Sequence, residues 1–455
     1  MRQINVTRFL VIWLSCLSVA FAISPKKLPE NAKTENVLDF LGKGRQSVST
    51  ETHLLKDLSQ LNLIWEFEKG ESYTSPVIKE EKLIYAHSKD DRLMVECLNS
   101  VTGKSIWHYE HALAYRDSYG YGNGPRGSAI IDEGRVYLHD VAGTLLCLSL
   151  EDGKKIWSIN TNEKYDVPQA FFGVTSTPLM EGDLIIVNVG SPGGPCVVAF
   201  DKLTSKEVWK AGQQWQASYA SPVAATFHGK RRVLVYAGGK TRPPVGGLMC
   251  INPENGEIDF EFPWRSETFE SVNASTPIVF GNKIYISATY ETGGCLLEIQ
   301  SDFSYKKLWE SQDLNCHWNT PIHQNGYIYG VHGRHPRTAS LVCLDATVGK
   351  KVWEDRILWS EKIPGYDREV NFRLQLGSLL KVDGNYLCLS EMGHLMWMRL
   401  NPAGVEVLSR KRLFTAKQTW CAPVVSNGLL YVSQNEKDRI SGAMPRLKCY
   451  DIRGK

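Results

Sequence analysis

The stretch CLNSVTGKSIW at residues 97–107 decides the fold, because the chain repeats it. CLSLEDGKKIW stands at residues 147–157 and CLDATVGKKVW at residues 343–353. Each copy reads as an apolar strand, a polar turn that contains glycine, and a second strand that carries tryptophan. A unit that recurs in this way indicates a repeat architecture, in which neighbouring repeats pack on one another.

A second pair of strands accompanies this unit. SPVIKEEKLIYAHS (75–88), STPIVFGNKIYISA (275–288) and NTPIHQNGYIYGVH (319–332) each place apolar runs on both sides of a short turn, which predicts a hairpin. A proline or serine marks the start of the hairpin about every fifty residues, the period of a propeller blade. The eight markers are Pro76, Ser128, Pro178, Pro222, Pro277, Pro321, Ser378 and Pro423. Four short strands per repeat, with no helix between them, predict an all-β, eight-bladed β-propeller of four-stranded blades.

The two ends of the repeat array complement each other. The last repeat ends at RLKCYDIRGK (446–455) without a tryptophan strand, whereas NLIWEFEKG (62–70) supplies such a strand before the first repeat. We therefore expect the N-terminal strand to complete the eighth blade, which removes an exposed sheet edge. The propeller is expected to be a single domain over residues 61–455, preceded by a linker and clasp over residues 23–60.

The glycines and tryptophans of the repeat have expected structural roles. Gly103 and Gly153 stand four residues before a tryptophan, in a turn that favours a positive φ. A tryptophan on an outer strand has an apolar face to bury against the next blade and an N–H that needs an acceptor. These docking residues are Trp65, Trp107, Trp157, Trp209, Trp309 and Trp353.

The cysteines mostly follow the same repeat. Cys97, Cys147 and Cys343 fall at one register before the turn, where a small buried hydrophobe fits. A single disulfide is left open among the cysteines outside this register, which are Cys196, Cys295, Cys316, Cys388 and Cys421. No pair of cysteines or histidines has zinc-site spacing, so no metal site is predicted.

The N-terminus has the pattern of a targeting signal. Arg2 and Arg8 precede the short apolar run FLVIWLSCLSVAFA, which ends in Ala20-Phe21-Ala22. This pattern predicts a signal peptide over residues 1–22 and export to the periplasm of a Gram-negative-type bacterium, or secretion. No later segment is apolar for long enough to span a membrane. The net charge of +3 does not indicate a nucleic-acid partner, and we expect a monomer.

The repeat motif also resembles a known family. The motif contains a small residue, Asp or Asn, three further residues, and then Gly, Lys and Trp. This motif is similar to the tryptophan-docking repeat of pyrroloquinoline-quinone (PQQ)-type eight-bladed propellers. That superfamily contains quinoprotein alcohol dehydrogenases and the scaffold lipoprotein of the outer-membrane barrel-assembly machinery. FLGKGRQSVSTETHLLKDL (40–58) and YGNGPRGSAIIDEGRVYLHD (121–140) further resemble exported PQQ-like propellers of the planctomycete type. The resemblance implies a fold, and the fold hosts several activities.

Three functions remain open on the sequence. The first is a binding or scaffold module, since no G-x-S-x-G or H-E-x-x-H motif is present. The second is a dehydrogenase that uses PQQ with Ca²⁺, as the resemblance implies, although the family's metal ligands and catalytic Asp cannot be matched to residues of this chain. The third is a carbohydrate-active propeller enzyme, whose site would be assembled from scattered aromatic, Arg and His residues.

The expected binding surface lies on one face of the propeller. With strands named A to D from the inside outward, the D–A links between blades and the B–C turns share one face, which we call the D–A face. These links are long and rich in aromatic and polar residues, as binding loops on a rigid frame are. We expect a small molecule, a glycan or a protein to bind there. The candidate ligand-binding residues are Tyr121, Asn123, Arg126, Trp215, Tyr219, Trp264, Asn273, His317, Trp318, Arg373 and Trp420.

Overall fold

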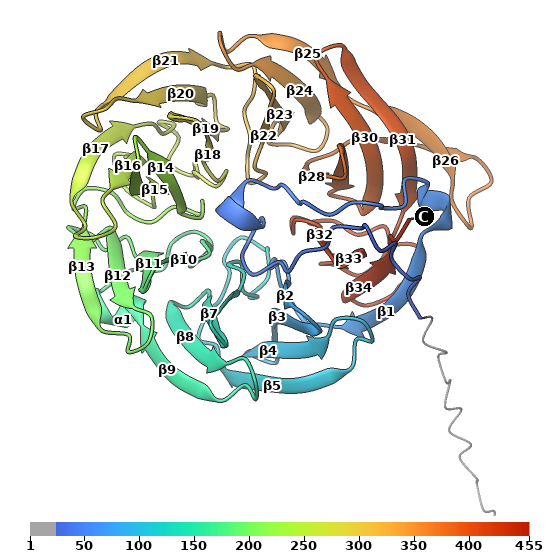
Figure 1. Cartoon of the computed structure of the whole chain (residues 1–455), viewed down its shortest axis with the longest axis horizontal. Coiled ribbons are helices and arrows are strands. Elements are labelled where there is room, and N and C mark those ends of the chain that lie inside the picture. Colours follow the sequence, from blue (N-terminus) through green and yellow to red (C-terminus); the bar gives the residue numbers. More distant parts are fainter. Residues whose placement is uncertain (1–23, 455) are drawn as a thin grey trace, which may run out of the picture.

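The fold is an eight-bladed, all-β propeller, as the repeat pattern predicts. The computed structural model describes residues 24–454, so the predicted signal peptide at residues 1–22 lies outside the described residues. Eight four-stranded antiparallel sheets surround a central axis, and the short inner strands lie nearest to that axis (Figure 1). Within residues 24–454, helical structure is confined to three short turns, which are α1 (Thr161–Lys164) and the 3₁₀ turns η1 (Lys43–Arg45) and η2 (Leu58–Gln60).

Every blade consists of four strands, ordered from the inner to the outer position. Blade 1 consists of β2 (Val77–Lys79), β3 (Lys82–Lys89), β4 (Arg92–Asn99) and β5 (Ser105–Ala112), and blade 2 consists of β6 (Ile130–Asp132), β7 (Arg135–His139), β8 (Thr144–Ser149) and β9 (Lys155–Asn160). Blade 3 consists of β10 (Leu179–Glu181), β11 (Leu184–Asn188), β12 (Val197–Asp201) and β13 (Glu207–Ala211), and blade 4 consists of β14 (Val223–Phe227), β15 (Lys230–Ala237), β16 (Gly247–Ile251) and β17 (Ile258–Pro263). Blade 5 consists of β18 (Ile278–Phe280), β19 (Lys283–Ala288), β20 (Gly293–Ile299) and β21 (Tyr305–Ser311), and blade 6 consists of β22 (Ile322–Gln324), β23 (Tyr327–His332), β24 (Ser340–Asp345) and β25 (Lys351–Asp355). Blade 7 consists of β28 (Gly377–Val382), β29 (Asn385–Ser390), β30 (His394–Asn401) and β31 (Gly404–Arg412), and blade 8 consists of β32 (Val424–Ser426), β33 (Leu429–Ser433), β34 (Arg446–Asp451) and β1 (Asn62–Glu68). The link between blades 6 and 7 contains an additional hairpin of β26 (Leu358–Lys362) and β27 (Glu369–Arg373).

The N-terminal strand completes the eighth blade, which confirms the expected closure. Strand β1 pairs antiparallel with β34, so the sheet runs β1-β34-β33-β32. Trp65 on β1 lies opposite Cys449 on β34. The first and last parts of the repeat array are therefore joined by backbone hydrogen bonds, and the outer edge of β34 is paired.

Each docking tryptophan connects its blade to the next one. The indole N–H of Trp65 donates to the carbonyl of Ser100 at 2.9 Å, and that of Trp107 donates to the carbonyl of Leu150 at 3.1 Å. Trp157, Trp209, Trp309 and Trp353 make the same contact with the C–D turns of their neighbours. The indole is thus satisfied at its polar atom while its ring is packed between blades.

The glycine of the repeat contacts the tryptophan of the preceding blade. Gly153 has a φ of 71°, which L side chains rarely adopt. A Cβ at this position would lie 2.5 Å from Cε3 of Trp107. Glycine is therefore required for two reasons at this position, the turn and the close approach of the indole ring.

The cysteines are buried and free. All ten cysteines within residues 24–454 are unpaired and buried, so the disulfide that the sequence leaves open is absent from this part of the chain. Cys97 lies opposite Trp107 and Cys147 lies opposite Trp157 in their sheets. The repeated cysteine is the small residue across the strand pair from the large docking residue.

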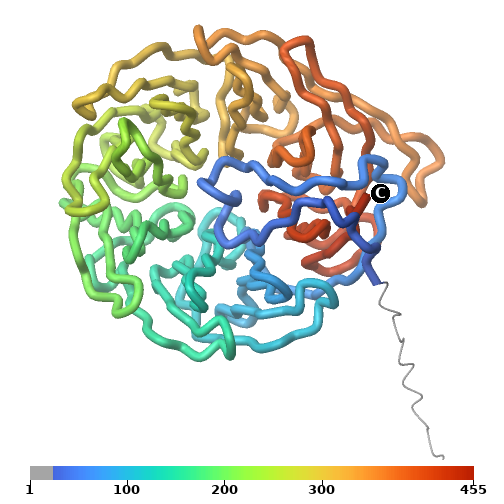
Figure 2. The backbone as a smooth tube through the Cα atoms, viewed as in Figure 1, coloured from blue at the N-terminus to red at the C-terminus, as the bar shows by residue number. Residues whose placement is uncertain are grey.

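Residues 24–61, which we call the strap, cross one face of the propeller. The strap runs from the rim to the centre and back to the rim before it enters β1 (Figures 1 and 2). It contacts A–B turns on the way: Asn36 accepts from the N–H of Glu80 at 2.7 Å, and Lys56 pairs with Asp383 at 2.6 Å. This face carries the A–B and C–D turns, and we call it the strap face.

Arg45 anchors the middle of the strap at the propeller axis. Its side chain is 1% exposed and donates to the carbonyls of Thr177 at 3.1 Å and Pro222 at 2.8 Å, where the inner strands of blades 3 and 4 begin. It also pairs with Asp39 at 2.8 Å. The strap therefore covers the centre of the strap face, and the guanidinium of Arg45 reaches between the innermost strands.

Within residues 24–454, no helix is long and apolar enough to cross a membrane.

Candidate functional site

The D–A face, opposite the strap, carries a ring of aromatic side chains. Seven of the eight D–A links each contribute a half-buried aromatic residue to this set. In the eighth link, the half-buried Phe372 of the β26–β27 hairpin packs on Trp359 and His394 instead. We call this set the aromatic ring: Tyr73, Tyr121, Phe172, Tyr219, Phe269, Trp318 and Trp420. Half-buried rings keep part of their surface available to a ligand.

Trp420 contacts three other members of the aromatic ring. It stacks on Tyr73, with a centroid distance of 5.3 Å and an interplanar angle of 24°. Tyr121 lies 5.3 Å and Trp318 lies 6.1 Å from it. Links that are hundreds of residues apart in sequence are therefore brought together at one place, as the propeller closure requires.

The ring continues through Phe172 toward blades 3 to 5. Phe172 meets Tyr121 edge-on at 5.5 Å and lies 5.4 Å from Tyr219. The hydroxyl of Tyr219 accepts from the backbone N–H of Phe172 at 3.3 Å. The adjacent Phe171 is buried and meets Phe269 edge-on at 5.3 Å. The seven links thus form one contacting surface instead of separate loops.

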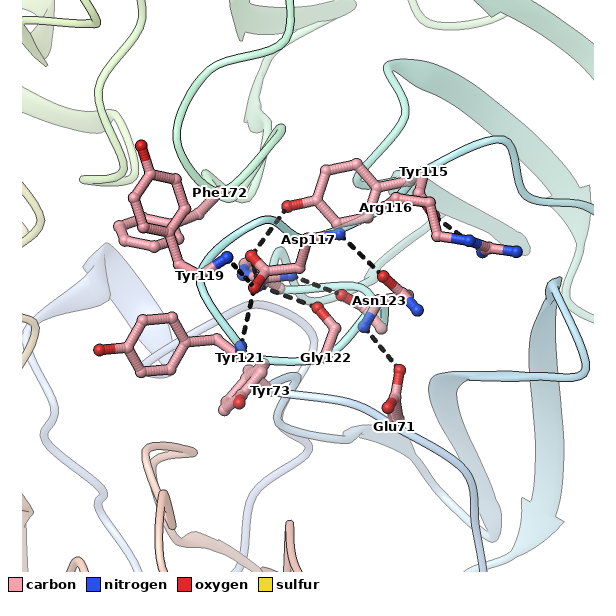
Figure 3. Close-up of polar contacts among 12 residues, drawn as sticks. Glu71, Tyr73, Tyr115, Arg116, Asp117, Tyr119, Tyr121, Gly122, Asn123 and Phe172 are labelled. Atoms are coloured by element: carbon pink, nitrogen blue, oxygen red, sulfur yellow. Dashed lines mark hydrogen bonds and ion pairs between the residues drawn. The ribbon is translucent and has the colours of Figure 1, made fainter.

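The link between blades 1 and 2 is organised around Asp117 (Figure 3). The Asp117 side chain is 2% exposed, and it accepts from the backbone N–H groups of Tyr119 at 2.9 Å and Tyr121 at 2.8 Å. Asn123 accepts from the N–H of Asp117 at 2.8 Å. Such side-chain to backbone bonds fix a loop that has no strand partners of its own, and in this link they hold Tyr121 in the aromatic ring.

Arg126 also supports this link from within. It donates to the carbonyls of Gly124 at 3.0 Å and Gly122 at 3.2 Å, and it pairs with Asp117 at 3.3 Å. Its guanidinium lies 5.2 Å from the centre of the Tyr73 ring. Arg126 and Asn123 are thus engaged in holding the loop, and the rings of Tyr73 and Tyr121 are what they position.

Glu391 is a buried carboxyl group next to Trp420. It lies in the B–C turn of blade 7, is 6% exposed, and accepts from the indole N–H of Trp420 at 2.9 Å through Oε1. Its Oε2 is buried and has no hydrogen-bond partner. Burial raises the pKa of Glu391, and the indole N–H opposes that shift. The carboxyl group of Glu391 therefore fixes the orientation of Trp420.

His317 directly precedes Trp318 in the link between blades 5 and 6. Its Nδ1 is 3.1 Å from the hydroxyl of Thr289, and its ring meets Tyr290 edge-on at 5.8 Å. Burial lowers the pKa of His317 to about 4, and the positive charge of Arg334 acts in the same direction. The imidazole is therefore neutral at pH 7.

Four other candidate residues do not join the aromatic ring. Trp215 is buried in the apolar core between blades 3 and 4, and Trp264 stacks on Phe262 in the core of blades 4 and 5. Asn273 is buried and donates to the carbonyls of Ala237 and Trp264. Arg373 lies on the exposed β26–β27 hairpin and donates to the carbonyl of Arg337.

Sequence reasoning missed Tyr73, Phe172, Phe269 and Glu391. The first three stand in D–A links, but these links hold several aromatic residues, such as Trp264 beside Phe269, and the sequence does not show which of them joins the ring. Glu391 stands in a short B–C turn, SEMGH (390–394), which has no distinctive motif. Only the three-dimensional structure brings it to Trp420.

Comparison with known proteins places this geometry in a family. A family model described as outer membrane protein assembly factor BamB, PQQ_2, matches residues 94–355, which is more than half of the chain. The chain belongs to this family of PQQ-type repeat propellers.

Curated relatives of the chain include quinone-dependent enzymes. The dehydrogenase subunit of an alcohol dehydrogenase (quinone) from Komagataeibacter europaeus is 30% identical over 165 residues, which cover 34% of this chain and 22% of that protein. The quinohemoprotein alcohol dehydrogenase ADH IIB from Pseudomonas putida is 22% identical over 395 residues, covering 78% of this chain and 53% of that protein. The chain thus spans between about a fifth and a half of the length of these relatives.

Solved structures with the same fold include both kinds of protein. BamB from Moraxella catarrhalis has a TM-score of 0.55 at 15% identity, covering 87% of this chain and 98% of that one. The quinohemoprotein alcohol dehydrogenase from Comamonas testosteroni has a TM-score of 0.63 at 13% identity, covering 92% of this chain and 81% of that one. At these identities the likeness concerns the fold alone.

The described residues do not fit a PQQ and Ca²⁺ site. A calcium ion needs several oxygen ligands that converge on one point, and within residues 24–454 no three His, Cys, Asp or Glu side chains form such a group. Asp117 is engaged by Arg126 and two backbone N–H groups, and Glu391 is bound to Trp420. One face of the Trp420 indole is stacked on Tyr73.

Proposed function

We propose that this chain is an exported binding or scaffold module that takes a small molecule, a glycan or a protein on its D–A face. One observation carries the proposal: seven D–A links place one half-buried aromatic side chain each in a single ring. Aromatic residues on rigidly held loops are typical of ligand-binding surfaces. The strap covers the centre of the opposite face, which leaves the D–A face as the mouth of the propeller.

The anchoring of Trp420 supports a binding role. Its indole is fixed by Glu391 at 2.9 Å and by stacking on Tyr73, so a ligand that contacts it meets a ring already held in place. Pre-ordered aromatic groups lose little conformational entropy on binding and dominate the affinity of many interfaces. We therefore expect Trp420 to contribute more to binding than any other member of the ring.

The experiment is a screen of the full mature chain against a glycan array, with two variants. Trp420→Ala removes the centre of the aromatic ring, and Phe280→Ala is the matched control, because Phe280 is a half-buried aromatic residue on the strap face that stacks on His323. We expect glycans bound by the wild type to bind Trp420→Ala at least about tenfold more weakly and Phe280→Ala unchanged. Equal binding by all three proteins would refute the proposed face.

The quinoprotein relatives support a second candidate, a PQQ-dependent dehydrogenase. The purified chain is titrated with PQQ in the presence of CaCl₂, and dye-linked oxidation of ethanol is measured. We expect neither stoichiometric binding nor turnover, because within residues 24–454 no three His, Cys, Asp or Glu side chains gather at one point to hold the cation. Tight binding with turnover would replace the binding-module proposal by the dehydrogenase.

A further inference from the structure

A basic groove opens on the D–A face between the loops of blades 3, 4 and 5. It has a volume of 350 Å³ and is formed by the link before blade 3, the links on either side of blade 4, and the B–C loop of blade 4 at residues 238–246. Its lining contains two cations, two amides, an aromatic ring and no carboxylate. The lining residues are Pro168, Gln169, Ala170, Gln216, Lys240, Arg242 and Phe269.

The B–C loop of blade 4 has a narrow neck that only glycine allows. A Cβ on Gly246 would lie 2.5 Å from Cα of Gly238, and a Cβ on Gly239 would lie 2.5 Å from Cβ of Gln216. Gly238 has a φ of 138°. The loop therefore leaves and re-enters the blade through a tight constriction, which places its tip, with Lys240 and Arg242, over the groove.

Arg265 fills the inside of this loop. Its guanidinium donates to the carbonyls of Gly239, Val245 and Ser271, the last two at 3.0 and 3.1 Å, and so ties the loop to the link before blade 5. All of its hydrogen-bond acceptors are carbonyl or hydroxyl oxygens, and none is a carboxylate. The positive charge beneath the groove is thus left without a counter-ion among the described residues.

Lys240 and Arg242 add two exposed positive charges at the surface of the groove. The Arg242 guanidinium lies 3.7 Å from the centre of the Phe269 ring, and the Lys240 ammonium lies 5.3 Å from that of Phe171. Neither side chain forms an ion pair with any residue in the range 24–454, whereas most other exposed arginines on this chain's strands do. Two cations held over aromatic rings, with no acid beside them, favour an anion.

We propose that this groove binds an acidic saccharide, with a carboxylate on Lys240 and Arg242 and sugar hydroxyls on Gln169 and Gln216. Arginine and lysine recognise carboxylates by charge-assisted hydrogen bonds. Side-chain amides both donate and accept, as hydroxyl groups do, and a volume of 350 Å³ is in the range of small-molecule pockets and exceeds what a simple inorganic anion fills. This proposal names a ligand class for the D–A face and rests on the proposed function.

The test measures binding of trigalacturonate to the full mature chain by isothermal titration calorimetry at low ionic strength. The neutral control ligand is galactotriose. The variant Lys240→Gln with Arg242→Gln removes both charges. The matched control is Lys104→Gln with Lys155→Gln, two exposed lysines on the strap face, one in the C–D turn of blade 1 and one at the start of β9. We expect the wild type and the control to bind trigalacturonate alone, and the groove variant to bind it at least about tenfold more weakly.

Several results would overturn the assignment. It fails if trigalacturonate does not bind, if galactotriose binds equally well, or if the groove variant binds like the wild type. It also fails if inorganic phosphate or citrate binds as tightly as trigalacturonate, because the groove is then a simple anion site. If glycan-array binding depends on Trp420 while the groove variant keeps all of it, the proposed function stands and this inference alone is rejected.

Discussion

Substitution of Gly153 by alanine tests the interlock between blades, by which we mean the close contact of the repeat glycine with the tryptophan of the preceding blade, here Trp107. Two effects add at this position. The φ of 71° is unfavourable for alanine by about 1 kcal/mol. The new Cβ would stand 2.5 Å from Cε3 of Trp107, a contact that forces the indole or the turn to move and that destabilises by a further ~1–3 kcal/mol, as overpacking does. We therefore expect Gly153→Ala to lower the free energy of unfolding by about 2–4 kcal/mol.

Gly134→Ala in the same blade separates the two effects. Gly134 has a φ of 80°, similar to that of Gly153, but a Cβ there would meet no atom within 4 Å. Only the backbone contribution of about 1 kcal/mol should remain. Both variants are compared by urea unfolding monitored through tryptophan fluorescence. The interlock is refuted if the two variants differ by less than about 0.5 kcal/mol, since the contact with Trp107 would then have no energetic role.

Three other perturbations probe the strap, the closure and a buried histidine. Arg45→Ala removes a buried guanidinium that pairs with the half-buried Asp39 and donates to two backbone carbonyls, and it should destabilise the chain by about 1–3 kcal/mol. Lys43→Ala, at an exposed position of the same turn, should change thermal unfolding little. Equal effects would mean that the strap is not anchored at the axis. A chain that begins at residue 71 lacks β1 and should lose cooperative unfolding or self-associate, and a monomer with unchanged melting would contradict the closure. Burial lowers the pKa of His139 to about 4, so the unfolded state binds the proton first as the pH falls, and the free energy of unfolding should decrease by about 1.4 kcal/mol per pH unit from pH 6.5 down to pH 4. The difference in free energy of unfolding between wild type and His139→Gln, measured across that range, should show this slope. A difference that does not change with pH would contradict it.

The fold could be predicted from the sequence because each blade repeats the same local instructions. The glycine turn before Trp107 or Trp157, and the hairpin that accompanies it, recur often enough to give the number of blades and the missing strand. The sequence shows the turn that glycine requires. It does not show that the same glycine contacts the tryptophan of another blade, because that contact depends on how blades are stacked.

The path of the strap could not be predicted in the same way. Residues 24–61 have no repeat, and their contacts join single side chains to turns far away in sequence. Arg45 stands in the turn KGR (43–45), which gives no sign that its guanidinium is buried at the axis. A contact that occurs once, over more than a hundred residues of separation, leaves no periodic signal in the sequence.

The sequence predicts which face carries the aromatic ring better than it predicts which residues form that ring. Tyr121, Tyr219, Trp318 and Trp420 come together on the D–A face because their links all end at the inner strands. Whether a polar residue in such a link faces a ligand depends on its local partners. Arg126 has Asp117 within its own loop, and the two hold each other.

The central claim is that the D–A face, and not the strap face, is the ligand-binding surface. Hydrogen–deuterium exchange of the full mature chain, with and without the tightest-binding glycan of the array, tests it most directly. We predict slower exchange in the links at residues 111–127, 161–174 and 416–422, with unchanged exchange in the strap. Protection confined to the strap and the A–B turns, with none in the D–A links, would contradict the account.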